Sequence, residues 1–155
     1  QIFFKMLEYK DLIPCCTGMI QREVAQRMAA GPGSKTYGIL SVLIQAWYDV
    51  EYLFTVDENV FNPPPKVKSA VIRMTRNKVT DIGCDQVLFK RVVKTVFNQR
   101  RKMLRVSLRQ IFNMGKPADG FYEQDIMTKR PEQLSITQFV ELTNMVEEQL
   151  ANYQQ

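Results

Sequence analysis

The run Phe61-Asn62-Pro63-Pro64-Pro65-Lys66-Val67-Lys68-Ser69-Ala70-Val71 decides how this chain is organised. Three consecutive prolines fix φ and remove three backbone donors, so residues 63–65 cannot lie in a helix or a central strand. They predict a stiff, extended connector, and the apolar residues after it predict a strand. Phe61 stands at the lip of this connector, where an aromatic ring can stack on a flat ligand such as a base. The alternative is that Phe61 packs in the core, as most aromatic side chains do.

Apolar periodicity on both sides of this run predicts a mixed α/β region that extends to residue 77. Its expected elements are a helix over 2–9, a buried strand over 13–20, a helix over 23–30, a loop over 34–38, a buried helix over 39–47, and strands over 50–56 and 68–74. Gly31-Pro32-Gly33 ends the second helix, because Gly followed by Pro is a common helix stop. The region therefore alternates helices and strands up to a polar linker at residues 78–84.

Beyond the linker the pattern is helical throughout, which predicts a small helical domain over residues 85–155. An unbroken helix from Asp85 would place Leu108 on its basic face, so we expect a break near Asn98-Gln99. The second helix would then bury a stripe made of Leu104, Leu108, Ile111 and Phe112. Ser135 and Gln138 have the spacing of a capping box, which predicts the start of the last helix.

Positive charge is concentrated in one part of the chain. The formal net charge is +5, yet residues 85–116 contain nine Lys or Arg and one acid, so the rest of the chain is net negative. Such a block points to a polyanion, and nucleic acid is the first candidate. The alternative is a solvated helix face. The cations that we expect to follow a phosphate backbone, at helical spacing, are Arg100, Arg101, Lys102, Arg105 and Arg109.

Composition also excludes several classes of protein. The chain has no His, which removes Ser-His and Cys-His catalysis and any His-metal site from this sequence. Its three cysteines lack zinc-ligand spacing, so we expect no metal and interpret them as structural thiols of a reducing cytoplasm. No apolar run approaches the roughly 18 residues that cross a membrane, so no membrane partner is expected.

Three stretches carry a resemblance to a known family. They are the proline run from Phe61, the segment Gln21-Arg22-Glu23-Val24-Ala25-Gln26-Arg27 with Ala30-Gly31-Pro32-Gly33-Ser34-Lys35-Thr36-Tyr37-Gly38-Ile39-Leu40-Ser41-Val42, and Phe97-Asn98-Gln99-Arg100-Arg101-Lys102-Met103-Leu104-Arg105-Val106-Ser107-Leu108. In this order they resemble the KsgA-type rRNA adenine dimethyltransferases over nearly the whole chain. Erm-type 23S rRNA methyltransferases and mitochondrial transcription factors of the same fold share much of the pattern.

The resemblance implies a C-terminal part of a longer enzyme. Residues 1–77 would be the C-terminal half of a Rossmann-like class I methyltransferase sheet, of the doubly wound kind, and residues 85–155 an rRNA-binding helical domain. The sequence has no G-x-G-x-G loop after a strand and no acidic residue placed to hold a ribose. The S-adenosylmethionine site is therefore expected upstream of Gln1. The fragment itself is expected to be inactive, and an exposed sheet edge predicts a possible dimer.

The implied activity is S-adenosylmethionine-dependent dimethylation of N6 of two adjacent adenines near the 3′ end of 16S rRNA, in the 30S ribosomal subunit. Phe61 would stack on the target adenine, which must leave its helix or come from a loop. Lys35, in a Gly-rich loop, would contact the RNA backbone or help to shape the substrate cleft. Lys66 and Lys68, beside the stacking aromatic, would contact phosphates near the target base, although they are equally well explained as ordinary surface lysines. No metal is implied.

Two other classes stay open. One is a non-catalytic ribosome-assembly or transcription factor of the same fold, and the other is a basic helical nucleic-acid binder whose likeness to methyltransferases is superficial. Within the enzymes, an Erm-type 23S rRNA adenine methyltransferase is the alternative.

Overall fold

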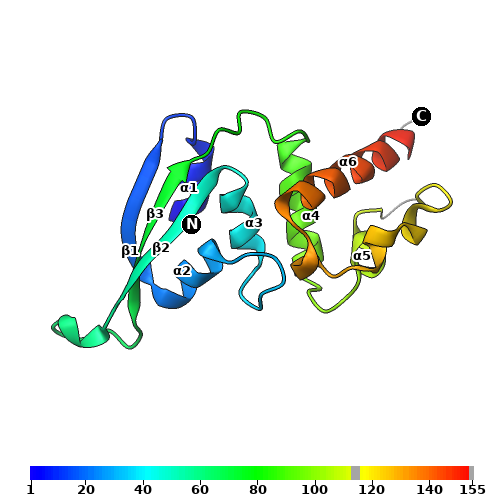
Figure 1. Cartoon of the computed structure of the whole chain (residues 1–155). Coiled ribbons are helices and arrows are strands. Elements are labelled where there is room, and N and C mark those ends of the chain that lie inside the picture. The colour runs from blue at the N-terminus through cyan, green and yellow to red at the C-terminus, as the bar shows by residue number, and fades with distance from the viewer. Residues whose placement is uncertain (113–115, 154–155) are drawn as a thin grey trace. The chain divides into compact units, whose positions relative to one another are not determined.

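The computed structural model describes residues 1–112 and 116–153, and these fall into two compact units. Residues 1–31 and 40–80 form the first, here called the sheet unit, and residues 32–39 and 81–155 form the second, the helical unit. The chain thus enters the helical unit briefly at residues 32–39, here called the crossing segment, before it returns to the sheet unit. Figure 1 follows this path by colour.

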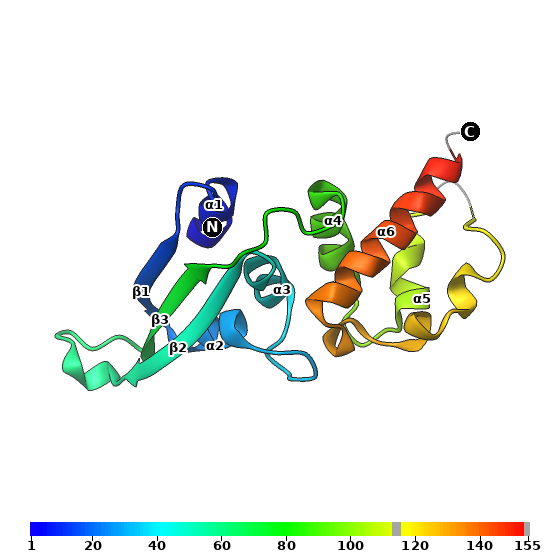
Figure 2. The ribbon, with the colours of Figure 1, turned by 45° about the horizontal axis from the view of Figure 1, so that its top comes forward.

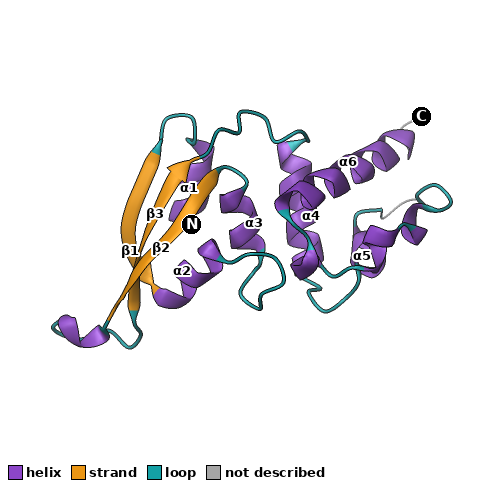
Figure 3. Cartoon of the chain, in the orientation of Figure 1, coloured by secondary structure: helices purple, strands orange, loops and turns teal. Residues whose placement is uncertain are grey.

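The sheet unit contains a three-stranded sheet in the order β1-β3-β2 (Figures 1 and 3). The strands are β1 (Cys15–Gln21), β2 (Tyr48–Val56) and β3 (Ser69–Arg76), and the helices are α1 (Ile2–Glu8), α2 (Arg22–Ala29) and α3 (Ile39–Gln45). Each of these elements overlaps the one expected from the sequence. β2 begins at Tyr48, two residues before the expected start, because Tyr48 pairs with Arg76 at the end of β3.

Both strand pairings are antiparallel, with β3 between β1 and β2. A doubly wound sheet is mostly parallel, so the described sheet differs from that expectation in its pairings. β1 and β2 run in the same direction as each other, and α2 and α3 lie between them in the chain. The connection from β1 through α2 and α3 to β2 therefore joins two strands of the same direction, as a crossover connection does. The antiparallel strand β3 lies between them in the sheet.

Burial follows one face of the central strand. Ala70, Ile72 and Met74 alternate along β3 and are almost completely buried, while Arg73 and Thr75 on the other face are exposed. This period of two is what a half-buried strand requires. The expectation that the first strand is buried was wrong, because β1 lies at an edge of the sheet and most of its side chains are exposed.

The helical unit is built around α4 (Gln86–Phe97) and α6 (Ile136–Tyr153), which pack against each other (Figure 2). Asp85 caps α4 by accepting from the Leu88 amide at 2.7 Å. The expected capping box starts α6, since the Ser135 amide donates to the Gln138 carboxamide at 2.9 Å and the Gln138 amide donates to Ser135 Oγ at 3.2 Å.

The expected break after α4 is confirmed. α4 ends at Phe97, and α5 (Leu104–Ser107) begins seven residues later and continues as a short 3₁₀ turn, η2 (Leu108–Gln110). The expected stripe of Leu104, Leu108, Ile111 and Phe112 is buried. Residues 116–135 were expected to be helical, but the structure has only 3₁₀ turns there, which are η3 (Phe121–Glu123), η4 (Asp125–Thr128) and η5 (Pro131–Gln133). Pro117 and Pro131 each remove a backbone donor, which disfavours a continuous helix.

Candidate nucleic-acid interface

The loop between β2 and β3, residues 57–68 and here called the proline loop, carries the candidate stacking aromatic. The antiparallel pair Val56–Ser69 closes its base. Asp57 starts a 3₁₀ turn, η1 (Glu58–Val60), by accepting from the Asn59 amide at 2.8 Å. The prolines form neither helix nor strand, as expected. The connector bends at residues 61–63, where the Asn62–Pro63 peptide is cis, instead of being extended throughout.

Phe61 follows this 3₁₀ turn directly, and its amide donates to the Glu58 carbonyl at 3.3 Å. The side chain is half-buried and does not belong to the core of the sheet unit. Its partial exposure is compatible both with a stacking role and with packing at the edge of the core, so the role of Phe61 stays a prediction. Lys66 is exposed and Lys68 is half-buried on the return arm of the loop. The Lys68 carbonyl accepts from the Arg22 amide at 2.9 Å, which holds this arm beside the start of α2.

In the helical unit, the cations lie on a turn and not along one helix. Arg100, Arg101 and Lys102 lie between α4 and α5, in residues 98–103, here called the arginine turn. The expectation that five cations follow one helix was wrong, because α5 begins only at Leu104. The Lys102 amide donates to the Gln99 carbonyl at 2.9 Å, which closes the turn.

Four of the expected cations of the helical unit are exposed, namely Arg101, Lys102, Arg105 and Arg109. Arg105 lies in α5 and Arg109 in η2. Arg109 Nε donates to the Arg105 carbonyl at 3.1 Å, and its guanidinium carbon lies 4.8 Å from the centre of the Tyr122 ring. Exposed guanidinium and ammonium groups on adjacent turns suit contact with a phosphate backbone.

Arg100 is arranged differently from its neighbours. Its Nη2 donates to the Ser34 carbonyl at 3.2 Å and to the Lys35 carbonyl at 2.8 Å, and it lies 3.5 Å from Glu132 Oε2. The structure therefore brings Lys35 to the arginine turn across a separation of 65 residues. Sequence reasoning singled out both Lys35 and the turn but had no signal that placed them together.

Tyr37 anchors the same crossing segment, although the sequence pointed only to the Gly-rich loop that contains it and predicted no site role for Tyr37 itself. Its side chain is completely buried, its hydroxyl donates to the Leu134 carbonyl at 2.8 Å, and its ring meets Phe97 edge-on at 6.0 Å between centroids. Burial raises the pKa of Tyr37 to about 12. An aromatic residue in a Gly-rich loop was the only available signal, and it does not reveal which domain the ring enters.

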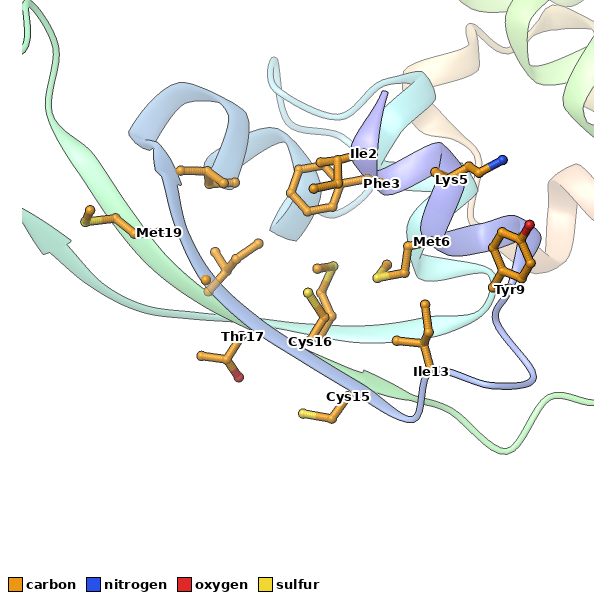
Figure 4. Close-up of a pocket in the computed structure, with 14 residues that line it drawn as sticks. Ile2, Phe3, Lys5, Met6, Tyr9, Ile13, Cys15, Cys16, Thr17 and Met19 are labelled. Atoms are coloured by element: carbon orange, nitrogen blue, oxygen red, sulfur yellow. The ribbon is translucent and has the colours of Figure 1, made fainter.

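A groove of about 500 Å³ lies between α1 and β1 in the sheet unit (Figure 4). Its lining is mainly apolar, with Phe3, Met6 and Met19 among the residues drawn, and Lys5 is its one charged side chain. A sulfonium and a ribose call for acidic and hydrogen-bonding groups. The groove supplies no carboxylate, so its residues do not fit S-adenosylmethionine.

The rest of the described chain was searched for metal ligands, thiols and membrane-spanning helices. Within residues 1–112 and 116–153, no cluster of three or more His, Cys, Asp or Glu side chains has the geometry to hold a metal ion. Cys15, Cys16 and Cys84 are free thiols, and burial raises the pKa of Cys84 to about 11. In the same described residues, no helix has both the length and the apolar character needed to cross a bilayer.

Comparison with solved structures defines the class of fold. The chain is similar to a dimethyladenosine transferase from Plasmodium falciparum, with a TM-score of 0.80 and 22% identity over 96% of this chain and 62% of that one. It is also similar to the 23S rRNA methyltransferase ErmE, with a TM-score of 0.56 and 20% identity over 94% of this chain and 59% of that one. The described residues therefore have a methyltransferase fold.

Sequence comparison identifies the family. The family model for ribosomal RNA adenine dimethylase matches residues 1–148, and the chain belongs to this family. It is 70% identical over 152 residues to the ribosomal RNA small subunit methyltransferase A of Phocaeicola vulgatus, covering 98% of this chain and 53% of that protein. It is 71% identical over 150 residues to the protein of that name from Bacteroides thetaiotaomicron, covering 97% of this chain and 55% of that protein. The chain spans about half the length of these curated relatives.

Proposed function

We propose that the intact protein uses S-adenosylmethionine to dimethylate N6 of two adjacent adenines near the 3′ end of 16S rRNA, on the 30S ribosomal subunit in the cytoplasm. The observation that carries the proposal is the family match over residues 1–148, together with about 70% identity to proteins named small subunit methyltransferases. Residues 1–77 would be the C-terminal half of a Rossmann-like catalytic sheet. Residues 78–84 would be a linker, and residues 85–155 the rRNA-binding domain.

In this proposal Phe61 supplies one wall of the pocket for the target adenine. The base must leave its stack before its exocyclic amine is accessible, and stacking on an aromatic side chain contributes about 1–3 kcal/mol per base. The half-buried ring on the bent proline loop supports this role, because it is held by η1 yet not enclosed by the core. Lys66 and Lys68 would contact the phosphates beside the target.

Methyl transfer to an amine depends on alignment more than on acid–base help, so positioning is the main contribution expected from this chain. The arginine turn, with Arg105 and Arg109, would bind the rRNA backbone and hold the enzyme in register on the subunit. Phosphate contacts of this kind fix position and orientation but carry no direct sequence information. A-form RNA is recognised mainly by shape and backbone, which suits such a cationic surface.

No residue of this chain is assigned to the methyl donor. The groove between α1 and β1 does not fit S-adenosylmethionine, so residues 1–155 expressed alone are expected neither to bind the donor nor to transfer a methyl group. Calorimetric titration of this chain with S-adenosylmethionine tests that point, and tight binding would overturn it. Dimerisation through the edge strands β1 or β2 stays a prediction, which sedimentation of the same sample measures.

The central experiment uses the full-length protein and small ribosomal subunits that lack the modification. Transfer of label from S-adenosylmethionine to two adjacent adenines is the expected result. Binding to the subunit without transfer would favour a non-catalytic factor of the same fold. Transfer to large-subunit rRNA instead would favour an Erm-type activity.

A further inference from the structure

The crossing segment is fastened to the helical unit at both ends. Near its start, the Gly33 amide donates to the Glu132 carbonyl at 2.7 Å. Near its end, Tyr37 enters the core and donates to the Leu134 carbonyl at 2.8 Å. Lys35 and Thr36 lie between these anchors with exposed side chains. The segment therefore presents Lys35 on a loop whose two ends are both held by residues of η5 and its C-terminal cap.

Arg100 reaches the middle of this segment. Its Nη2 contacts the Ser34 carbonyl at 3.2 Å, the Lys35 carbonyl at 2.8 Å and Glu132 Oε2 at 3.5 Å, and its guanidinium carbon lies 5.8 Å from the Phe97 ring centre. A planar guanidinium with five donors can serve several acceptors at once, whereas an ammonium is a compact point charge. The residue thus joins the arginine turn, the crossing segment and η5 through one side chain.

The charge of Arg100 is already partly balanced within the protein. The Glu132 carboxylate is in contact with it, and the Arg100 side chain is only one-third exposed, whereas Arg101 and Lys102 are exposed. Counterion release on RNA binding comes from cations that meet phosphates. Arg100 is therefore suited to organise the surface, and its two neighbours are suited to bind.

We propose that Arg100 is a positioning residue, which fastens the crossing segment so that Lys35 joins Arg101 and Lys102 in one phosphate-binding surface. This inference rests on the proposed rRNA binding, and it assigns different roles to neighbouring residues of the arginine turn. Lys35 contributes the phosphate contact, and Arg100 acts through it.

The test compares Arg100→Lys and Arg100→Gln with Arg101→Lys and Arg101→Gln in the full-length protein, with affinity for small ribosomal subunits measured over a range of salt. Both Arg100 variants are expected to lose affinity equally, by roughly two- to fivefold, which is the scale of one exposed ion pair. Arg101→Lys should retain affinity because it keeps the charge. Arg101→Gln should lose affinity and lower the salt slope by roughly 0.7 to 1.

A double-mutant cycle with Lys35→Gln separates positioning from a purely structural role. If Arg100 acts through Lys35, Arg100→Gln should cause no further loss of affinity in the Lys35→Gln protein. Additive losses, with wild-type affinity in Arg100→Lys, would overturn the inference and make Arg100 a direct phosphate ligand. Thermal unfolding of each variant shows whether the fold is kept, and Arg100→Lys retains most of the side-chain volume.

Limited trypsin digestion reports on the fastening without RNA. Faster cleavage after Lys35 in Arg100→Lys than in Arg101→Lys is expected, and equal rates would contradict the fastening. If Lys35→Gln, Arg101→Gln and Lys102→Gln all bind subunits like wild type, the proposed RNA surface is wrong. The cleavage rates still decide the role of Arg100 in that case.

Discussion

The proline loop and the arginine turn are both candidate RNA-binding elements, but they are built in different ways. The proline loop is local: β2 and β3 pair at its base, and Asp57 and the prolines shape the twelve or so residues between them. The arginine turn, in contrast, has a partner from a distant part of the chain, because Arg100 donates to the carbonyl of Lys35, 65 residues away. The first holds one aromatic ring in place, and the second gathers several charges. Loss of the ring should therefore slow methyl transfer itself, while loss of a charge should weaken binding by degrees.

The sharpest test of this contrast is Phe61→Ala. Loss of a stacking contact of about 1–3 kcal/mol corresponds to a fall in methyl transfer of roughly five- to 150-fold, with subunit affinity little changed. Single-turnover transfer from labelled S-adenosylmethionine in the full-length protein measures the first quantity, and sedimentation with subunits measures the second. Phe54→Ala is the matched control, since Phe54 is an exposed aromatic, 56% accessible, in the same unit. Equal activity of the two variants would remove Phe61 from the site.

Neutralising two cations of the arginine turn should have the opposite profile. Arg101→Gln with Lys102→Gln is expected to weaken subunit binding by roughly tenfold, from two ion pairs of up to about 1 kcal/mol each. The salt slope should fall by roughly 1.4 to 1.8, while the transfer rate at saturation is kept. Lys78→Gln, which removes an exposed cation of the sheet unit, is the control. If the double variant instead changed the rate of methyl transfer at saturation and left the affinity for subunits unaltered, the arginine turn would contribute to the transfer step and not to binding.

Tyr37→Phe tests the anchoring of the crossing segment. Loss of the bond to the Leu134 carbonyl should lower the free energy of unfolding by about 1 kcal/mol at neutral pH. The pKa of Tyr37 is about 12 in the folded state and ordinarily 10.0. Between these two values the hydroxyl keeps its proton in the folded protein but loses it in the unfolded chain. This contribution to stability is complete below pH 10 and is lost as the pH rises toward 12.

The gap in stability between wild type and Tyr37→Phe should therefore shrink above pH 10. Denaturant unfolding at pH 7, 10 and 11 measures it, with Tyr52→Phe as the control because the Tyr52 hydroxyl pairs with Thr55 on an exposed part of the sheet unit. If the difference in stability between wild type and Tyr37→Phe grew with pH, the pKa of Tyr37 would be lowered in the folded state and not raised.

The smallest effect is expected from Glu51→Gln on the exposed face of the sheet. Arg73 Nε donates to Glu51 Oε2 at 2.6 Å, and this bond lowers the pKa of Glu51. The stabilisation is present above the unfolded pKa and disappears as the pH falls through the folded one. Wild type and Glu51→Gln should differ slightly at neutral pH and converge in acid, as read from denaturation midpoints. A marked loss of stability at neutral pH would show that the pair does more than a surface ion pair normally does.

Much of the local structure was predictable because it depends on short-range patterns. The prolines excluded regular structure, and the capping-box spacing of Ser135 and Gln138 predicted the start of α6. The break after α4 was predicted because a continuous helix would have placed the apolar Leu108 on the basic face. Two local expectations were wrong for reasons that lie outside the local pattern. The apolar pattern predicted that β1 is buried, but β1 lies at an edge of the sheet. The spacing of the cations predicted one helix, but three of them lie in a turn that the Gln99 carbonyl closes.

The sequence by itself determined which residue types are present and where they lie along the chain: an aromatic before three prolines, and a cationic block with almost no acids. It also carried the family resemblance, because motifs are read in order along the chain. Only the tertiary structure decided that β3 lies between β1 and β2, that residues 32–39 belong to the helical unit, and that Arg100 holds Lys35 while Arg101 is left exposed. The physical reason is that periodicity and capping depend on neighbours within a few residues. Strand order and the partners of a guanidinium depend on which distant segments share a core.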